Sequence, residues 1–277
     1  MQFLSFTLLV GLTSLAAGLL GALTGLGGGV VIVPVLALLF HVDLRYAIGA
    51  SLVSVIATSS GAAAAYVREG FSNVRIGMFL EVATTVGALA GAYLTAIVST
   101  HAIAIVFGAV LLFSAWSSFW KKEPHGSRRP DGLALKLKLA GDYPAGAGVE
   151  EYAARRVPLG FGIMVLAGTL SGLLGIGSGA VKVLGMDQAM GLPFKVSTTT
   201  SNFMIGVTAA ASAGIYLRRG YIAPGLAAPV MLGVLLGSLV GSRMLLKLEV
   251  SVLRVVFAVV IVTLGVEMIF SGITGRL

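Results

Sequence analysis

The chain is dominated by long apolar runs, each about as long as a helix that crosses a lipid bilayer. The hydrocarbon core of a bilayer is about 30 Å thick, so a helix of roughly twenty residues crosses it. About eight such runs can be marked, and they cover 3–40, 46–67, 76–98, 102–120, 158–190, 196–217, 222–246 and 253–273. Because one soluble core cannot bury a chain that is 57% hydrophobic and 11% charged, with mean hydropathy +1.00, we predict an all-α polytopic protein in the lipid bilayer.

The first and fifth runs are too long to be single straight helices. At 1.5 Å per residue, a helix as long as the first run would reach about 55 Å. Each run carries a glycine cluster partway along, LTGLGGG at 23–29 and LLGIGSG at 173–179. We therefore expect each run to be a broken helix or a helical hairpin.

The two glycine clusters belong to a repeat with a constant offset of 150 residues, which aligns the halves of the chain without a gap. The pattern predicts two homologous transmembrane repeats, 1–120 and 158–277, of four to five helical segments each, with the first segment of each half broken at its glycine cluster. Matching pairs include Gly18 with Gly168, Gly25 with Gly175, Gly27 with Gly177, Gly29 with Gly179, Ser51 with Ser201, Gly87 with Gly237 and Gly91 with Gly241. We expect residues 3–20 to be retained as part of the first segment, since no basic residue precedes them as in a signal peptide.

Residues 121–157 separate the halves and differ from them in composition. They are charged and rich in Gly and Pro, which predicts a linker loop, with a short amphipathic helix over 133–139 on the membrane surface. The loop also holds the densest group of Lys and Arg, so the positive-inside rule places it in the cytoplasm. The net charge of +8 is thereby explained by membrane orientation, and we expect no nucleic-acid partner.

The sequence leaves two topologies open in the cell inner (cytoplasmic) membrane. If each half crosses four times, the repeats are parallel and both termini are cytoplasmic. If the glycine breaks are true reversals, each half crosses five times, the repeats are inverted and the termini lie outside.

The paired breaks are also the candidate binding site. Irregular backbone at membrane depth is tolerated where it is buried in protein or lines a wet cavity, and paired breaks in two halves point to a transport site. Helix N-termini there would attract an anion. The predicted substrate-binding residues are Gly25, Gly27, Gly28, Gly29, Ser51, Gly175, Gly177, Ser178, Gly179, Lys182, Thr198, Thr199, Thr200, Ser201 and Asn202.

Lys182 adds a full charge after the second break, and its counterpart in the first half is Ile32. The duplicated fold therefore does not require a cation there, which favours a functional role. Structural alternatives remain: the glycines only pack helices, Lys182 extends to an interface, Asp187 caps a short helix, and 198–202 form an ordinary helix start.

Other polar and small residues in the apolar runs give weaker signals. Glu81 is a candidate for proton coupling, because a carboxyl group in a membrane segment is costly unless it is protonated or paired. Glu267 is a weaker candidate of the same kind. Gly-x-x-x-Gly spacing at 87–91 and 233–242 brings helices close together, either within the subunit or in a homodimer.

Enzyme motifs fail on context. The chain has no cysteine, and its glycine clusters lack the strand, helix and acidic residue of a nucleotide-binding unit. No metal-ligand spacing and no Ser/His/Asp set is found. We predict no enzyme activity, no cofactor and no metal.

Four segments resemble the sulfite exporter TauE/SafE family of membrane permeases. They are GLGGGVVIVPVLALL, AIGASL, GIGSGAVKVLGMDQAMGLPFKVSTTTSNFMIG and YLRRGYI, and the resemblance covers 12–120 and 158–272. It implies export of small sulfur-containing anions such as sulfite or organosulfonates across the cytoplasmic membrane. The anion site follows from the residues, whereas sulfur comes from the resemblance.

We therefore predict a secondary transporter that exports a small sulfur oxyanion by alternating access. Lys182 would offset the charge of the substrate. The alternatives are a passive anion channel, a transporter of a different small organic anion, and a structural membrane protein whose glycines only pack helices.

Overall fold

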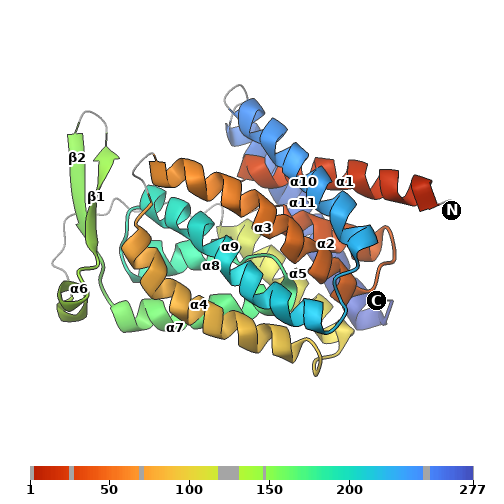
Figure 1. The fold of residues 1–277 in the computed structure, drawn as a ribbon, viewed down its shortest axis with the longest axis horizontal. Coiled ribbons are helices and arrows are strands. Elements are labelled where there is room, and N and C mark those ends of the chain that lie inside the picture. Colours follow the sequence, from red (N-terminus) through yellow and green to blue (C-terminus); the bar gives the residue numbers. More distant parts are fainter. Residues whose placement is uncertain are drawn as a thin grey trace.

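The computed structural model (Figure 1) describes residues 3–24, 28–68, 72–117, 131–145, 148–245 and 250–276. In this part of the chain the fold is helical apart from one β-hairpin, which confirms the all-α polytopic class. The elements of the first half are α1 (Phe3–Thr24), α2 (Gly29–Leu38), α3 (Leu44–Arg68), α4 (Val74–Leu94) and α5 (Thr100–Ser117). The connecting segment holds α6 (Gly132–Lys136), β1 (Ala140–Ala145) and β2 (Gly148–Ala153). The second half holds α7 (Val157–Leu174), α8 (Gly179–Leu184), the π-helical turn η1 (Gly185–Ala189), α9 (Phe194–Arg218), α10 (Pro224–Leu245) and α11 (Val250–Thr274).

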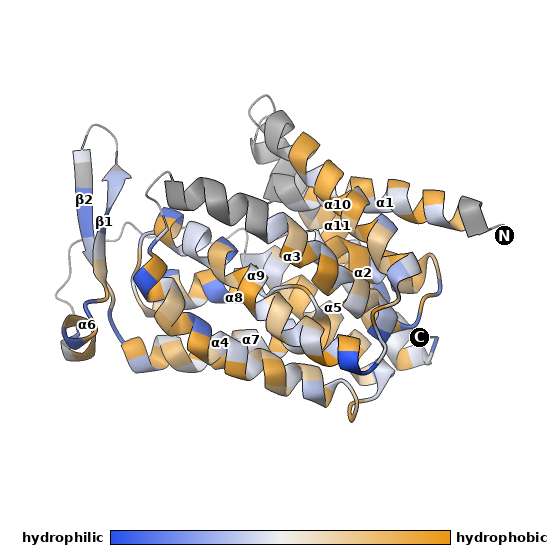
Figure 2. Cartoon of the chain, in the orientation of Figure 1, coloured by the Kyte–Doolittle hydropathy of each residue, from blue (hydrophilic) through white to orange (hydrophobic). Residues whose placement is uncertain are grey.

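The exposed faces of the helices carry large apolar side chains, and small residues lie on buried faces where helices approach closely. Among the described residues, α4, α5, α7 and α10 are each long and apolar enough to cross a membrane. On α4, Met78, Val82 and Val86 are exposed at helical spacing, whereas Gly87 and Gly91 lie on the buried face. This distribution suits a lipid-facing surface, because packing in lipid depends on close backbone approach rather than on hydrophobic burial. Figure 2 shows the contrast between the mainly hydrophobic helices and the hydrophilic hairpin.

Four helix pairs build the bundle, and each of them joins a helix of one half to a helix of the other. α1 packs on α10, α4 on α7, α5 on α11 and α3 on α9. A Cβ on Gly87 would collide with the carbonyl oxygen of Val165 in α7, and a Cβ on Gly237 would collide with that of Leu15 in α1. Gly87, Gly91, Gly233 and Gly237 therefore pack helices within the subunit, and a homodimer stays a prediction.

Contacts between the halves recur at the 150-residue offset seen in the sequence. A Cβ on Gly168 would collide with the backbone of Thr84. A Cβ on Gly18 would collide in the same way with the backbone of Val234. The internal duplication stays a prediction, and these paired contacts support it.

The two halves enter the bundle from opposite ends. In Figure 1 the N- and C-termini lie at one end of the molecule, and α6, β1 and β2 lie at the other. α1 begins at the end with the termini, whereas α7 begins beside the hairpin. The two halves therefore run in opposite directions, which favours the inverted topology, and the number of crossings and the side of the termini stay predictions.

The linker contains more structure than the loop that we predicted. β1 and β2 pair antiparallel, with Ala140 opposite Ala153, and α6 occupies part of the predicted helix at 133–139. Asn73, at the N-cap of α4, donates a hydrogen bond from Nδ2 to the Tyr152 hydroxyl oxygen at 2.9 Å, which fixes the hairpin to the bundle. Residues 121–130 and 146–147 of the linker lie outside the described residues.

Candidate functional site

The broken first segment of each half is a helical hairpin. In the second half the Arg155 backbone N–H donates to the Met190 carbonyl oxygen at 2.9 Å, so the chain after the break has returned to the start of α7. In the first half the rings of Phe6 and Phe40, at the start of α1 and after the end of α2, pack edge to face with centroids 5.8 Å apart. The hairpin interpretation of the two glycine clusters is therefore the correct one.

The second hairpin reverses through left-handed backbone. Gly175 and Gly177 have φ angles of +69° and +72°, and Ser178 follows at +48°. Glycine adopts these angles without a steric cost, whereas Ser178 is held in a strained conformation. The Ser178 hydroxyl is buried and has no hydrogen-bond partner among the described residues. This tip thus combines strain with an unused polar group.

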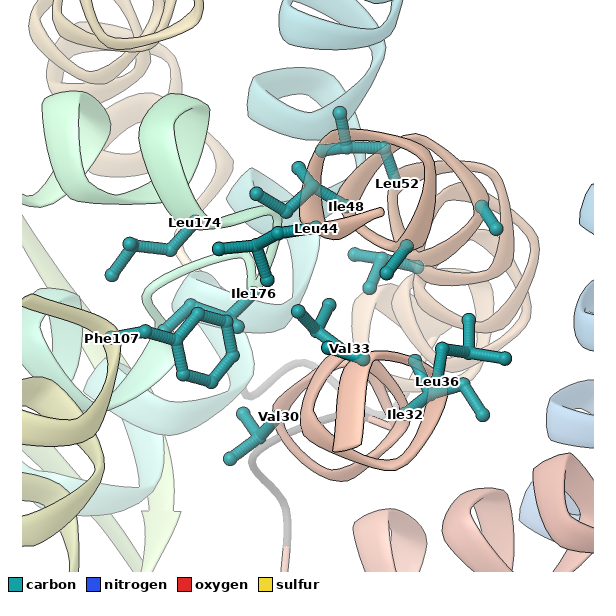
Figure 3. Close-up of a cluster of buried hydrophobic side chains, with 14 of the residues drawn as sticks. Val30, Ile32, Val33, Leu36, Leu44, Ile48, Leu52, Phe107, Leu174 and Ile176 are labelled. Atoms are coloured by element: carbon teal, nitrogen blue, oxygen red, sulfur yellow. The ribbon is translucent and has the colours of Figure 1, made fainter. Parts of the chain in front are cut away.

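The tips of the two hairpins meet at the centre of the bundle. Ser51 of α3 donates a hydrogen bond from Oγ to the carbonyl oxygen of Gly175 at 2.8 Å, and both residues are buried. A Cβ on Gly29 would lie 2.7 Å from Ser51 Oγ and 3.2 Å from the same carbonyl oxygen. Three predicted site residues from three elements are therefore in contact. Figure 3 shows the apolar cluster of this region, where Phe107 and Ile176 lie between Leu174 at the end of α7 and the side chains of α2 and α3.

The second hairpin also packs on α9 through predicted residues. Ser201 Oγ donates to the carbonyl oxygen of Gly179 at 3.4 Å. Ile205 fills the space beside Gly177, where a Cβ would approach its side chain to 2.8 Å. Close contact between backbone and helix thus holds the second tip against α9, as Ser51 holds it against α3.

Lys182 is the most unusual buried side chain of the described residues. It is 0% exposed and lies one turn into α8, with Nζ donating to Thr208 Oγ1 on α9 at 2.6 Å. Thr208 Oγ1 lies 2.8 Å from Glu81 Oε1 on α4 and can donate to it. Lys182 does not extend to an interface, so that alternative is wrong. The hydroxyl of Thr208 joins the ammonium group to the carboxylate.

Glu81 is 7% exposed, and its two oxygens differ in their surroundings. Oε1 accepts hydrogen bonds from Thr208 and from Thr85 Oγ1, the latter at 3.2 Å. Oε2 is buried without a hydrogen-bond partner in the described part of the chain. The sequence suggests separate roles for Glu81 and Lys182, whereas the structure joins them in one network.

The run at 198–202 does not begin its helix. α9 begins four residues earlier, at Phe194, so the first-turn N–H groups belong to 194–197 and the prediction that 198–202 open the helix is wrong. Thr198 Oγ1 donates to the carbonyl oxygen of Phe194 at 2.9 Å, and Thr199 Oγ1 to that of Lys195 at the same distance.

The remaining predicted residues have varied surroundings. Thr200 Oγ1 accepts a hydrogen bond from the Asn73 backbone N–H at 3.1 Å, and Asn202 is half-buried. Gly28 is buried at the N-cap of α2. Asp187 is buried in η1. Gly25 and Gly27 lie outside the described residues.

Sequence reasoning missed the threonines that bind the two charges. Thr84 and Thr85 follow Glu81 by three and four residues, so they share its helical face, and this spacing was a usable signal. Thr208 lies seven residues after Ser201, close to two helical turns, and it extends the same polar face. Nothing in the sequence pairs Thr208 with Glu81, because α9 and α4 lie in different halves.

Two hairpins that meet tip to tip in a polytopic helical bundle, beside a buried cation, define a membrane transporter rather than an enzyme. The chain belongs to the sulfite exporter TauE/SafE family, whose family model matches residues 10–268.

Two proteins of Bacillus subtilis (strain 168) are similar to it. One is named probable membrane transporter protein YunE and is 27% identical over 277 residues, covering 98% of this chain and 99% of the relative. The other is named probable membrane transporter protein YdhB and is 27% identical over 237 residues, covering 85% of this chain and 89% of the relative. No solved structure matches the chain significantly.

Proposed function

We propose that this membrane transporter is a secondary exporter of a small sulfur-containing anion, such as sulfite or an organosulfonate, and that it works by alternating access. The observation that carries the proposal is the fully buried Lys182, one turn after the tip of the second hairpin. A lysine at such a position is rare in membrane segments and marks a path for ions or substrates. The family supports sulfur chemistry, since its description names sulfite export.

The proposed site lies between the two hairpin tips. The start of α2 brings backbone N–H groups to the junction of the hairpins, which suits an oxyanion. Ser178 adds a buried hydroxyl that has no partner among the described residues, and Ser51 lies at the junction of the tips. A sulfonate group has three oxygens and one charge, so it matches an array of such donors with one nearby cation.

Two halves of opposite direction would allow this site to work by alternating access. Because the site lies where the halves meet, rocking one half against the other would open it to either side of the membrane in turn. The exported anion would then cross without a continuous pore.

Thermal stability of the purified full-length protein tests the proposed site. A ligand that binds the folded state alone raises the melting temperature, by about 2.7 kcal/mol of added stability at one hundred times its dissociation constant. The panel is sulfite, sulfate, isethionate, taurine, phosphate and acetate. We expect a sulfur oxyanion to raise the melting temperature of the parent, and to have no effect on Lys182→Ile.

Control variants separate loss of the site from loss of the fold. Lys136→Ile removes an exposed lysine of α6 and should respond like the parent. A Lys182→Arg variant keeps the charge and should keep a response. Stabilisation by acetate instead of a sulfur oxyanion would identify a transporter of a different organic anion, and equal responses of Lys182→Ile and the parent would contradict the proposed site.

Flux measurements separate a transporter from a channel. Reconstituted in vesicles, the protein should accumulate labelled sulfite against its electrochemical gradient when a proton gradient is imposed. A passive channel cannot do this, so flux that stops at electrochemical equilibrium under every ion gradient would show the channel alternative to be correct.

The proposed location is the cytoplasmic membrane, with the hairpin end in the cytoplasm. Described basic residues gather there, including Lys136, Lys138, Arg155 and Arg156. The positive-inside rule favours this orientation.

A further inference from the structure

The buried charges of Lys182 and Glu81 form a network that the fold does not need. Removing two ions from water costs several kcal/mol each, so a buried pair contributes little net stability and is often replaceable by apolar residues. The 150-residue offset shows such a replacement within this chain. Lys182 corresponds to Ile32, Glu81 to Met231 and Thr208 to Thr58.

Both charges are absent together from the counterpart positions. Thr84 and Thr85, which flank Glu81 on α4, correspond to Val234 and Leu235, so the counterpart region is apolar apart from its threonine. Val234 and Ile32 are fully buried there, which shows that the same packing is satisfied by hydrocarbon. Lys182 and Glu81 are therefore not required for packing, and their presence together indicates a functional role.

We infer that Glu81 is the coupling-proton site of the transporter and that its protonation makes Lys182 available to the substrate anion. With Glu81 ionised, its carboxylate balances the ammonium group of Lys182 through Thr208. When a proton adds to the carboxylate, the charge of Lys182 is no longer balanced, and an anion at the hairpin tips replaces the lost negative charge. One proton is therefore taken up for each anion bound. This inference rests on the proposed function.

The geometry provides a place for that proton. Oε1 accepts hydrogen bonds from Thr208 and Thr85, whereas Oε2 has no partner in the described residues. A proton can bind Oε2 without breaking either existing bond. The Glu81 carboxylate and the Lys182 ammonium group attract each other, and the Thr208 hydroxyl lies between them.

Lys182 is the charged partner of Glu81 among the described residues of the helices that pack around it. α7 and α9 pack on α4. α7 carries no ionisable side chain over Val157–Leu174, and α9 presents Thr208 to Glu81. Lys182 of α8 is the charged group that faces the carboxylate. Protonation of Glu81 therefore acts on one cation, and Thr208 is a positioning residue between them.

The test measures anion affinity as a function of pH, with isethionate as the probe because its sulfonate is its only acidic group and stays ionised. For uptake of one proton, the dissociation constant should fall by as much as about tenfold for each unit by which the pH is lowered. Glu81→Gln copies the neutral carboxyl group, so its affinity should be pH-independent and, at high pH, tighter than that of the parent. Glu267→Gln changes an exposed carboxylate of α11 and should keep the slope of the parent.

Thr208 gives a second test that keeps both charges. Thr208→Val removes the hydroxyl bridge and should flatten the pH dependence, and Thr208→Ser should restore it. In weakly buffered solution the parent should take up about one proton per isethionate bound, and Glu81→Gln about none.

Two failures are distinguishable. If isethionate binds the parent with a pH-independent affinity and without proton uptake, the coupling role of Glu81 is wrong and the anion site stands. If no sulfur oxyanion binds at any pH, whereas the folded protein is intact, the proposed function fails and the inference fails with it.

Discussion

Single and double substitutions of Lys182 and Glu81 should differ in their effect on the free energy of unfolding. Removing one partner leaves an uncompensated buried charge, so Lys182→Ile and Glu81→Met should each lower the free energy of unfolding by about 3–5 kcal/mol. The double variant copies Ile32 and Met231 of the first half, so it should be about as stable as the parent while losing anion binding. Denaturant midpoints of all four proteins give the coupling energy. Single substitutions without effect would show that the charges are not coupled.

Gly175 is the glycine where backbone conformation matters most. Its φ of +69° is unfavourable for any L side chain, and a Cβ would approach Ile48 Cγ2 to 2.7 Å. Gly175→Ala should therefore destabilise the protein by about 1–3 kcal/mol. Gly214→Ala on α9 is the matched control, since nothing lies within 4 Å of the added carbon. Equal melting temperatures for the two variants would show that the tip tolerates a different turn.

The contact between α4 and α7 depends on backbone approach. Gly87→Val should push the helices apart, because its Cβ would collide with the Val165 carbonyl oxygen, and we expect a loss of about 1–3 kcal/mol. Gly162→Ala on α7 places its Cβ in open space and should leave stability nearly unchanged. The two variants are compared by thermal unfolding in the same detergent. A stable Gly87→Val protein would mean that α4 and α7 can separate at little cost.

The β-hairpin is joined to the bundle through Tyr152, and burial of this hydroxyl should make the folded protein less stable at alkaline pH. Burial raises the pKa of the Tyr152 hydroxyl above 10.0, against the lowering effect of its hydrogen bond with Asn73, and the charge of Asp142 raises it further. The unfolded chain then loses this proton at lower pH than the folded protein, so the stabilising contribution falls as pH rises above about 10.

Tyr152→Phe isolates that contribution. The melting temperature of the parent should fall more steeply than that of the variant between about pH 9 and about pH 11. At neutral pH the variant should lose about 1 kcal/mol, the usual net value of one hydrogen bond. Parallel curves would show that Tyr152 does not couple the hairpin to the bundle.

Inverted topology of the complete protein can be tested in cells without removing native thiols, because the chain has no cysteine. Asp142→Cys places a thiol on the exposed hairpin, and Arg276→Cys places one near the C-terminus, at the opposite end. A membrane-impermeant maleimide applied to intact cells should label the second and not the first. Labelling of both or of neither would contradict the inverted arrangement.

The local sequence was sufficient to predict the class of protein, the two helix breaks and the unusual position of Lys182. Apolar length predicts membrane helices because lipid cannot satisfy an open backbone, and glycine clusters predict reversals because they permit left-handed conformations. It was not sufficient for the hairpin in the linker, since strand formation depends on the contacts that a strand makes, and one of these is the contact with Asn73 of the bundle.

The chain by itself thus determined that a charge lies at a helix break in the membrane, because composition and spacing are local properties. It did not determine what that charge contacts. Lys182, Thr208 and Glu81 come from α8, α9 and α4, and the network among them exists because close packing of small residues brings these helices within hydrogen-bonding distance. Helix packing alone sets that distance, since no local pattern links residues that are more than a hundred positions apart.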